Sequence, residues 1–208
     1  MPDNRIEAII FDLGNVLVDF DHRIAAKRIS YFTDKNGKEI YDLFFDSEVT
    51  GIFEEGKISP KQFFLKVKEM IGLRIEYEEF VPIWNEIFFF NQKNLGVYNL
   101  ACTLKENYRV ALLSNINALH LHYVKKTFPI FGAFHDIITS CDVGFRKPDP
   151  QIYQKALETL GVPAQKTFYT DDRKELIESA KLLGINGFTF VGLDQLRRDL
   201  VDNGININ

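Results

Sequence analysis

Short apolar runs in this chain lead into polar residues of the kinds that carry chemistry. In chain order these are Asp12, the pair Ser114-Asn115, Lys147, and the pair Asp171-Asp172. Runs of this length and composition indicate buried strands of a parallel sheet. Because the carboxyl ends of parallel strands border one crevice, we expect these residues to meet there although they are far apart in the sequence.

Each of these residue types suits a step of phosphoryl transfer. A carboxylate such as that of Asp12 can attack phosphorus and form an aspartyl-phosphate, which divides one displacement into two. Two or three carboxylates with a backbone carbonyl suit Mg²⁺, which prefers oxygen ligands and offsets the repulsion between carboxylate and phosphate. A lysine and a hydroxyl can bind the phosphate oxygens. Each of the four motifs is weak evidence by itself. Their order along the chain, each after a predicted strand, is what favours this chemistry.

The elements that must hold these residues alternate from Leu95 onward. Further apolar runs predict strands at 110–113, 137–139, 167–169 and 187–191. Apolar residues at three- and four-residue steps predict helices at 97–107, 118–127, 150–160 and 173–183. Asp149 can cap the third of these helices, with Pro150 at its first position and Gly161 at its end. The alternation predicts an α/β fold, a Rossmann-like parallel sheet flanked by helices.

The segment from Arg23 to Phe90 shows helical periodicity with no strand between its helices. Within it, Ser59-Pro60-Lys61-Gln62 has the form of a capping box. We therefore expect an all-helical insert at 23–90, placed after the first strand, with 1–22 and 91–208 forming the sheet domain. The charged stretch 53–57 is expected to be a solvated turn.

The composition is that of an ordinary globular protein. Of 208 residues, 46% are hydrophobic and 26% charged, and a net charge of -4 gives no reason to expect nucleic acid or an anionic membrane as partner. No apolar run approaches the roughly 20 residues that span a bilayer. Only Cys102 and Cys141 are present, and the N-terminus leads straight into the first strand with no room for a signal peptide. We expect a cytoplasmic monomer or homodimer that binds a small molecule.

The four motifs together resemble those of the haloacid dehalogenase-like hydrolase superfamily, over essentially the whole chain. Phe-Asp-Leu-Gly-Asn-Val at 11–16, Leu-Ser-Asn at 113–115 and Arg-Lys-Pro-Asp-Pro at 146–150 are most similar to its bacterial sugar-phosphate phosphatases, such as the α-D-glucose-1-phosphate phosphatases. The resemblance implies that the insert is a cap of the first type. It also implies a Mg²⁺-dependent phosphatase acting on a small phosphorylated metabolite, with a sugar phosphate as the best candidate.

The resemblance also implies residue roles. Asp12 would be the nucleophile and a metal ligand, and the other metal ligands would be the Gly14 carbonyl, Asp172 and Asp171. Ser114 and Lys147 would hold the phosphoryl group, with Asn115 beside it.

Two departures from the superfamily pattern stand out. Most phosphatases of the superfamily carry a second Asp two residues after the nucleophile as general acid and base, and this chain has Gly14 there. The sugar-phosphate branch shares that glycine. General acid–base help is typically worth about a hundred- to ten-thousand-fold in rate. The other departure is Arg173-Lys174-Glu175 after the Asp pair, where the branch often has small polar residues, so the usual support for the metal ligands is in question.

Residues near the start of the insert bear on the missing acid. Capping and hinge structure is the expected role of Asp19, Asp21, His22 and Arg23. The alternative is that one of them, or Glu54 from the insert, replaces the missing acid.

Three rival functions remain beside the phosphatase. A haloacid dehalogenase would use the same nucleophile against carbon without Mg²⁺, but Asp171-Asp172 without a cation would repel a carboxylate substrate. A response-regulator receiver domain would place its acidic pair after the first strand, the reverse of the order here. A binding protein that has lost catalysis is favoured only by Gly14 and by Arg173-Lys174.

Overall fold

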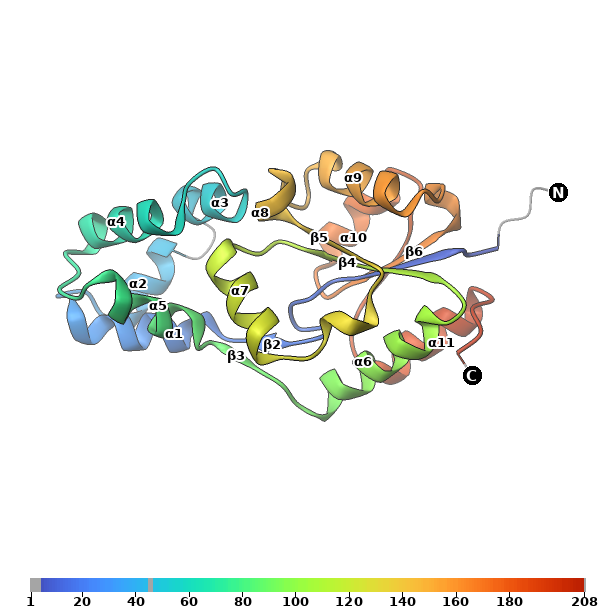
Figure 1. Ribbon diagram of the computed structural model, residues 1–208, viewed down its shortest axis with the longest axis horizontal. Coiled ribbons are helices and arrows are strands. Elements are labelled where there is room, and N and C mark those ends of the chain that lie inside the picture. Colours follow the sequence, from blue (N-terminus) through green and yellow to red (C-terminus); the bar gives the residue numbers. More distant parts are fainter. Residues whose placement is uncertain (1–4, 45–46, 208) are drawn as a thin grey trace.

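The computed structural model describes residues 5–44 and 47–207 of the chain. Five strands form one sheet in the order β5-β4-β1-β6-β7, and every neighbouring pair is parallel (Figure 1). The strands are β1 (Ala8–Phe11), β4 (Arg109–Ser114), β5 (Asp136–Thr139), β6 (Thr167–Asp171) and β7 (Asn186–Thr189). The predicted α/β fold is confirmed, and the carboxyl ends of all five strands point to one edge of the sheet.

Both faces of this sheet are covered by helices. Along β1, Ile9 and Phe11 belong to the apolar cluster of one face, and Ala8 and Ile10 belong to that of the other. The first face is covered by α6 (Gln92–Lys105) and α11 (Leu193–Asp202), and the second by α9 (Pro150–Leu160) and α10 (Lys174–Lys181) (Figure 1). Because β1 is buried on both faces, the residue that follows it is held in a fixed place.

Two more helices follow strands at the carboxyl edge, α7 (Ala118–Thr127) after β4 and α8 (Ser140–Val143) after β5. Single 3₁₀ turns lie at Ser30–Phe32, Phe131–Ala133 and Ala164–Lys166. The predicted start of α9 is as expected, since the Asp149 carboxylate accepts a hydrogen bond from the Gln151 N–H at 2.8 Å. At its end, Gly161 adopts a positive φ of 66°.

The segment after β1 is helical and has its own apolar centre. It contains α1 (His22–Ile29), α2 (Gly37–Phe44), α3 (Glu48–Glu54), α4 (Pro60–Ile71) and α5 (Tyr77–Asn85). Phe53, Phe63, Phe80 and Trp84 are fully buried in its cluster. Figure 1 shows this segment beyond the end of the sheet toward which β1 runs. The predicted capping box is present, with Ser59 and Gln62 each bonding the other's backbone N–H.

The ends of the helical segment differ from the prediction. β2 (Asp19–Phe20) and β3 (Phe88–Phe89) pair as an antiparallel ribbon where the segment leaves and rejoins the sheet. The sequence had predicted helical structure up to Phe90. Strands of two residues are too short to show the alternation by which a strand is recognised.

The stretch 53–57 also differs from the expected solvated turn. Phe53 is fully buried, and α3 continues to Glu54. Only Gly56 and Lys57 are exposed. The helix thus carries Glu54 toward the sheet instead of leaving it in solvent.

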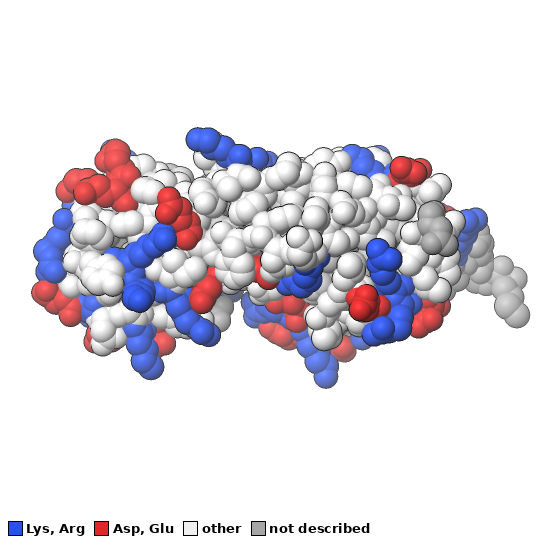
Figure 2. All heavy atoms as spheres, turned by 90° about the horizontal axis from the view of Figure 1, so that it is seen from below, with Lys and Arg blue, Asp and Glu red and all other residues white. Residues whose placement is uncertain are grey.

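The surface shows no concentration of one charge on the face drawn in Figure 2. Acidic and basic side chains are interspersed at both ends of that face, with a largely uncharged band between them. None of the helices in the described part of the chain has the length and hydrophobicity needed to cross a bilayer.

Candidate active site

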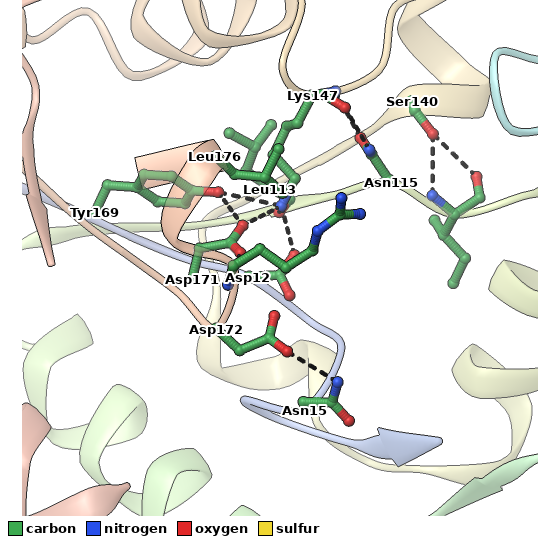
Figure 3. Close-up of polar contacts among 12 residues, drawn as sticks. Asp12, Asn15, Leu113, Asn115, Ser140, Lys147, Tyr169, Asp171, Asp172 and Leu176 are labelled. Atoms are coloured by element: carbon green, nitrogen blue, oxygen red, sulfur yellow. Dashed lines mark hydrogen bonds and ion pairs between the residues drawn. The ribbon is translucent and has the colours of Figure 1, made fainter. Parts of the chain in front are cut away.

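A buried lysine joins two of the predicted site carboxylates (Figure 3). The Nζ of Lys147 lies 2.6 Å from Oδ1 of Asp12 and 2.6 Å from Oδ2 of Asp171. The side chains of Lys147 and Asp171 are 1% exposed, and that of Asp12 is 9% exposed. Lys147 also donates to the Leu113 carbonyl at 3.2 Å. Buried charges need partners of this kind, so the cluster holds its members in one arrangement.

Each member of the cluster is placed by a strand end or a clamped loop. The N–H of Asp12 donates to the Thr170 carbonyl at 2.9 Å, which extends the pairing of β1 with β6. Asp171 is the last residue of β6, and its Oδ1 accepts from the Arg173 N–H at 2.9 Å. Lys147 lies in the loop before α9.

Asn115 clamps the loop that carries the lysine. Its Oδ1 accepts from the Lys147 N–H at 2.7 Å, and its Nδ2 donates to the Lys147 carbonyl at 2.8 Å. The sequence had placed Asn115 beside the phosphoryl group. The structure places it on the wall of the same cavity with its side-chain amide engaged by the Lys147 backbone.

The third predicted carboxylate, that of Asp172, completes a group able to hold a metal ion. One oxygen from each of Asp12, Asp171 and Asp172 can be chosen so that all three lie within 4.8 Å of one another. Oxygen donors from several carboxylates are the ligands that Mg²⁺ prefers. The Asp172 Oδ2 accepts a hydrogen bond from Asn15 Nδ2 at 2.9 Å (Figure 3).

The electrostatics of the cluster favour an added cation. Burial raises the pKa of Asp12 to about 7; Asp171 and Asp172 raise it too, and Lys147 opposes them. The pKa of Asp172 is raised by burial and held back by the hydrogen bond from Asn15. Burial would lower the pKa of Lys147, but Asp12 and Asp171 outweigh it and raise that pKa. Three carboxylates thus face one ammonium group, a surplus of negative charge that a divalent cation would balance.

A cavity of about 250 Å³ opens above this cluster, between the sheet edge and the helical segment. Its wall includes the buried Ser114 and the backbone of Gly14. Further wall residues from the helical segment and its connections are Phe20, His22, Tyr41, Thr50, Glu54 and Phe88, and those from the sheet side include His120, Arg146 and Arg173. The structure therefore brings all the predicted site residues to one cavity, which the helical segment covers.

The packing around Gly14 leaves little room for a side chain. A Cβ at this position would lie 2.6 Å from Cε1 of Phe20, far inside normal contact. The Phe20 ring fills the space that a side chain at position 14 would need. An aspartate there would require the ring to move.

The structure separates the residues considered as a replacement acid. His22 and Glu54 line the cavity, whereas Asp19 and Asp21 are not among the described residues of its wall. Asp21 caps α1 by accepting from the Arg23 N–H at 2.9 Å. Burial lowers the pKa of His22 to about 4. Glu54 Oε2 lies 3.4 Å from Nη1 of Arg146.

Sequence reasoning missed several residues of the site. The Tyr169 hydroxyl is fully buried and donates to Asp171 Oδ2, and it also accepts from Lys147 Nζ at 3.1 Å. The two-residue period of a strand could have found it, because residues 169 and 171 of β6 share one face. Asn15 stands next to Gly14 in the first motif, but its contact with Asp172 joins positions 157 residues apart.

The family of the chain follows from comparison with known proteins. A family model described as haloacid dehalogenase-like hydrolase matches residues 6–184, and the chain belongs to that family. This confirms the predicted family and a hydrolase with an α/β fold.

Similar proteins include phosphatases. A D-ribitol-5-phosphate phosphatase of Bacteroides thetaiotaomicron is 26% identical over 189 residues, covering 88% of this chain and 91% of that protein. A sesquiterpene phosphatase of Aspergillus oryzae is 26% identical over 182 residues, covering 87% and 88%. The crystal structure of a HAD family enzyme of B. thetaiotaomicron, in complex with magnesium and inorganic phosphate, superposes with a TM-score of 0.78 at 27% identity, covering 88% of this chain and 93% of that one.

Proposed function

We propose that the chain is a Mg²⁺-dependent phosphatase that hydrolyses a small phosphorylated metabolite through an aspartyl-phosphate on Asp12. The observation that carries the proposal is the position of Lys147 Nζ between Asp12 and Asp171 at the base of a covered cavity. The magnesium and phosphate bound by a similar enzyme support it.

The site residues have separate roles in a reaction of two steps. In the first step an oxygen of Asp12 forms a bond to phosphorus while the bond from phosphorus to the leaving oxygen breaks, and that oxygen takes up a proton. In the second step water attacks the same phosphorus, which releases phosphate and restores the carboxylate. Lys147 and the Ser114 hydroxyl bind the phosphoryl oxygens throughout. Asn115 keeps the lysine loop in place through its two bonds to the Lys147 backbone.

The metal would be held by Asp12, Asp171 and Asp172 with the Gly14 carbonyl, and the three-carboxylate cluster fits such an ion. When bound, Mg²⁺ supplies positive charge that offsets the repulsion between the Asp12 carboxylate and the phosphate.

We propose residues 23–90 as a cap domain over a core formed by 1–22 and 91–208. Support comes from the separate apolar cluster of the helical segment and from its place in the cavity wall. On the cap side, Glu54 is paired with Arg146 of the core, and Tyr41 and Thr50 add hydroxyls. This part of the wall carries little net charge and offers hydrogen-bonding groups at Glu54, Arg146 and Tyr41, while Thr50 Oγ1 already donates to the Phe44 carbonyl. It therefore suits a neutral, hydroxylated leaving group such as a sugar or polyol, as the similarity to a D-ribitol-5-phosphate phosphatase also suggests.

We place the enzyme in the cytoplasm, as a monomer or homodimer. Its two cysteines, Cys102 and Cys141, are both free thiols, which suits a reducing compartment.

The test is turnover of p-nitrophenyl phosphate by the purified protein with Mg²⁺ and with EDTA, beside an Asp12→Asn variant. We expect Mg²⁺-dependent release of nitrophenol that the variant and EDTA both abolish. Undiminished turnover by the variant would contradict the role of Asp12. Chloride release from 2-chloropropionate without metal would identify a dehalogenase, and phosphate binding without any turnover would identify a binding protein. A screen of phosphorylated metabolites then selects the substrate.

A further inference from the structure

The carboxylate of Asp172 is oriented by a residue from the opposite side of the cluster. Lys147 Nζ contacts the other two carboxylates, while Asp172 Oδ2 receives its hydrogen bond from Asn15 Nδ2 at 2.9 Å. Figure 3 shows Asn15 on the turn after β1, pointing toward Asp172 and away from the lysine. A donor to one carboxylate oxygen fixes the direction in which the other oxygen points.

Asn15 has an unusual backbone that needs support. Its φ is 55°, and among the described residues it alone combines a positive φ with a side chain. Asn tolerates this region better than other side chains do, but at some cost. The Asn15 N–H donates to the Val18 carbonyl at 2.8 Å, which closes the turn.

Lys93, at the start of α6, holds the other side of this turn. Its Nζ donates to the Asn15 carbonyl at 2.9 Å and contacts Asp19 Oδ1 at 2.5 Å. Asp19 is itself held by Asn91 Nδ2 at 2.7 Å and Asn94 Nδ2 at 3.1 Å. The side chains of Lys93 and Asp19 are 34% and 15% exposed, so this anchor is partly shielded from solvent.

We propose that Asn15 is a positioning residue for the metal site, and that Lys93 acts on the metal through Asn15. The proposal rests on the metal site of the proposed function. Asn15 donates to Asp172, whereas the Arg173 N–H donates to Asp171 and the Arg173 Nε pairs with Glu175. The proposal also gives Asp19 an anchoring role in place of proton transfer.

The first experiment measures Mg²⁺ binding directly, by calorimetry, in wild type and Asn15→Gly. Glycine keeps the positive φ and removes the amide, so the hydrogen bond is lost without backbone strain. We expect Mg²⁺ affinity to fall about 10- to 100-fold, the usual effect of losing a group that orients a metal ligand. Asn186→Ala is the control, because its Nδ2 also donates hydrogen bonds, but to backbone carbonyls at the amino end of β7. That variant should bind Mg²⁺ as wild type does.

The second experiment tests the route from Lys93. Lys93→Met should weaken Mg²⁺ binding in the wild-type background and add nothing in the Asn15→Gly background, since coupled residues are not additive. With p-nitrophenyl phosphate, both variants should need more Mg²⁺ for half-maximal rate but approach the wild-type rate at saturating Mg²⁺.

Several results would overturn the inference. If Asn15→Gly binds Mg²⁺ with wild-type affinity, Asn15 does not position the metal site. If Lys93→Met lowers Mg²⁺ affinity equally in the wild-type and Asn15→Gly backgrounds, Lys93 does not act through Asn15. Should Asn15→Gly fail to fold, wild-type affinity in Lys93→Met alone overturns the proposal. Binding is measured without substrate, so weaker binding in the variants supports the inference even if wild type hydrolyses no phosphate ester.

Discussion

The sheet edge and the helical segment above it are held by opposite kinds of interaction. At the sheet edge, Lys147 lies between the carboxylates of Asp12 and Asp171, all nearly buried. In the helical segment, Phe63 stacks on Phe53 with ring centroids 4.3 Å apart and packs on Trp84 at 4.9 Å. Buried charges keep one geometry because each needs its partners, whereas aromatic packing stabilises a unit without directing any group at a substrate.

Polar contacts at Ser140, His120 and Arg146 join the two regions. Ser140 Oγ donates to the Glu54 carbonyl at 2.6 Å and accepts from the Ile116 N–H at 3.0 Å. His120 Nε2 lies 3.1 Å from the Trp84 carbonyl, and Arg146 pairs with the Glu54 carboxylate. Substitutions at the sheet edge should therefore change the chemistry, whereas substitutions at these contacts should change how the substrate is held.

Lys147→Met should give the largest effect. It leaves Asp12 and Asp171 buried without the ammonium group that both contact. Removing one partner of a buried ion pair costs about 3–5 kcal/mol of unfolding free energy. Turnover of p-nitrophenyl phosphate should be lost as well. Urea unfolding with and without Mg²⁺ measures the stability, and we expect Mg²⁺ to stabilise the variant more than wild type because the cation replaces the missing charge.

The control for that prediction is Lys155→Met, at a lysine whose side chain is 54% exposed on α9. It should leave both stability and turnover near wild type. A Lys147→Met protein as stable and as active as this control would show that the buried pair does not organise the sheet edge.

The sequence predicted the residues of the sheet edge better than it predicted the arrangement of the helical segment. Asp12, Ser114 and Asp171 could be found because each stands where a buried strand ends, and the topology then brings the strand ends together. Asn15 could not be assigned, because its role depends on a contact with Asp172 across the cluster, whereas the two-residue period of β6 places Tyr169 on the same face as Asp171. The ribbon of β2 and β3 was missed because two residues carry no periodicity.

The sequence predicted that this segment is helical, but it did not predict where the helices end or how they face the sheet. Its apolar residues and the Ser59 cap indicate helices, but nothing in the sequence says which helix ends face the sheet. Glu54 was expected in a solvated turn, and it lies in the cavity wall because α3 continues to this residue. Gly14 was recognised as a missing acid, but only the packing reveals that the ring of Phe20 lies where a side chain at this position would begin.

Acid should weaken the junction between the two regions. His120 lies on α7 with its ring 5.4 Å from that of Trp84 and 6.1 Å from that of His22. Burial lowers the pKa of His120 to about 3, with His22 adding to the shift, and burial lowers the pKa of His22 to about 4. The unfolded chain takes up these protons near pH 6.5, so below that pH it binds more protons than the folded chain does.

The stability that the two neutral histidines contribute is therefore fully present above pH 6.5 and is lost as the pH falls toward 4. Each histidine should cost about 2 kcal/mol between pH 6.5 and 5, at about 1.4 kcal/mol per pH unit. The difference between wild type and His120→Asn in urea unfolding at a series of pH values measures the His120 part of this loss, since the raised pKa of Asp12 acts on stability in the opposite direction. His120→Asn should have a shallower slope than wild type, while His122→Asn, at an exposed position on the same helix, should keep the wild-type slope. Parallel slopes for wild type and His120→Asn would contradict the prediction.

Glu54→Gln should give the smallest effect and the most specific one. The substitution keeps the shape of the side chain and the backbone contact with Ser140, but it removes the charge that faces Arg146. An ion pair whose side chains are 23% and 29% exposed is worth at most about 1 kcal/mol. A carboxylate accepts stronger hydrogen bonds from substrate hydroxyls than an amide does. We expect KM for a polyol phosphate such as D-ribitol-5-phosphate to rise by about three- to fivefold, which is under 1 kcal/mol, and turnover of p-nitrophenyl phosphate to stay unchanged.

Glu48→Gln, at an exposed position on α3, is the control and should change neither. If instead Glu54 is the missing acid, kcat for the polyol phosphate should fall by about a hundredfold or more with KM little changed. Steady-state kinetics on the two substrates thus decide whether the helical segment only holds the substrate or also takes part in the chemistry of the sheet edge.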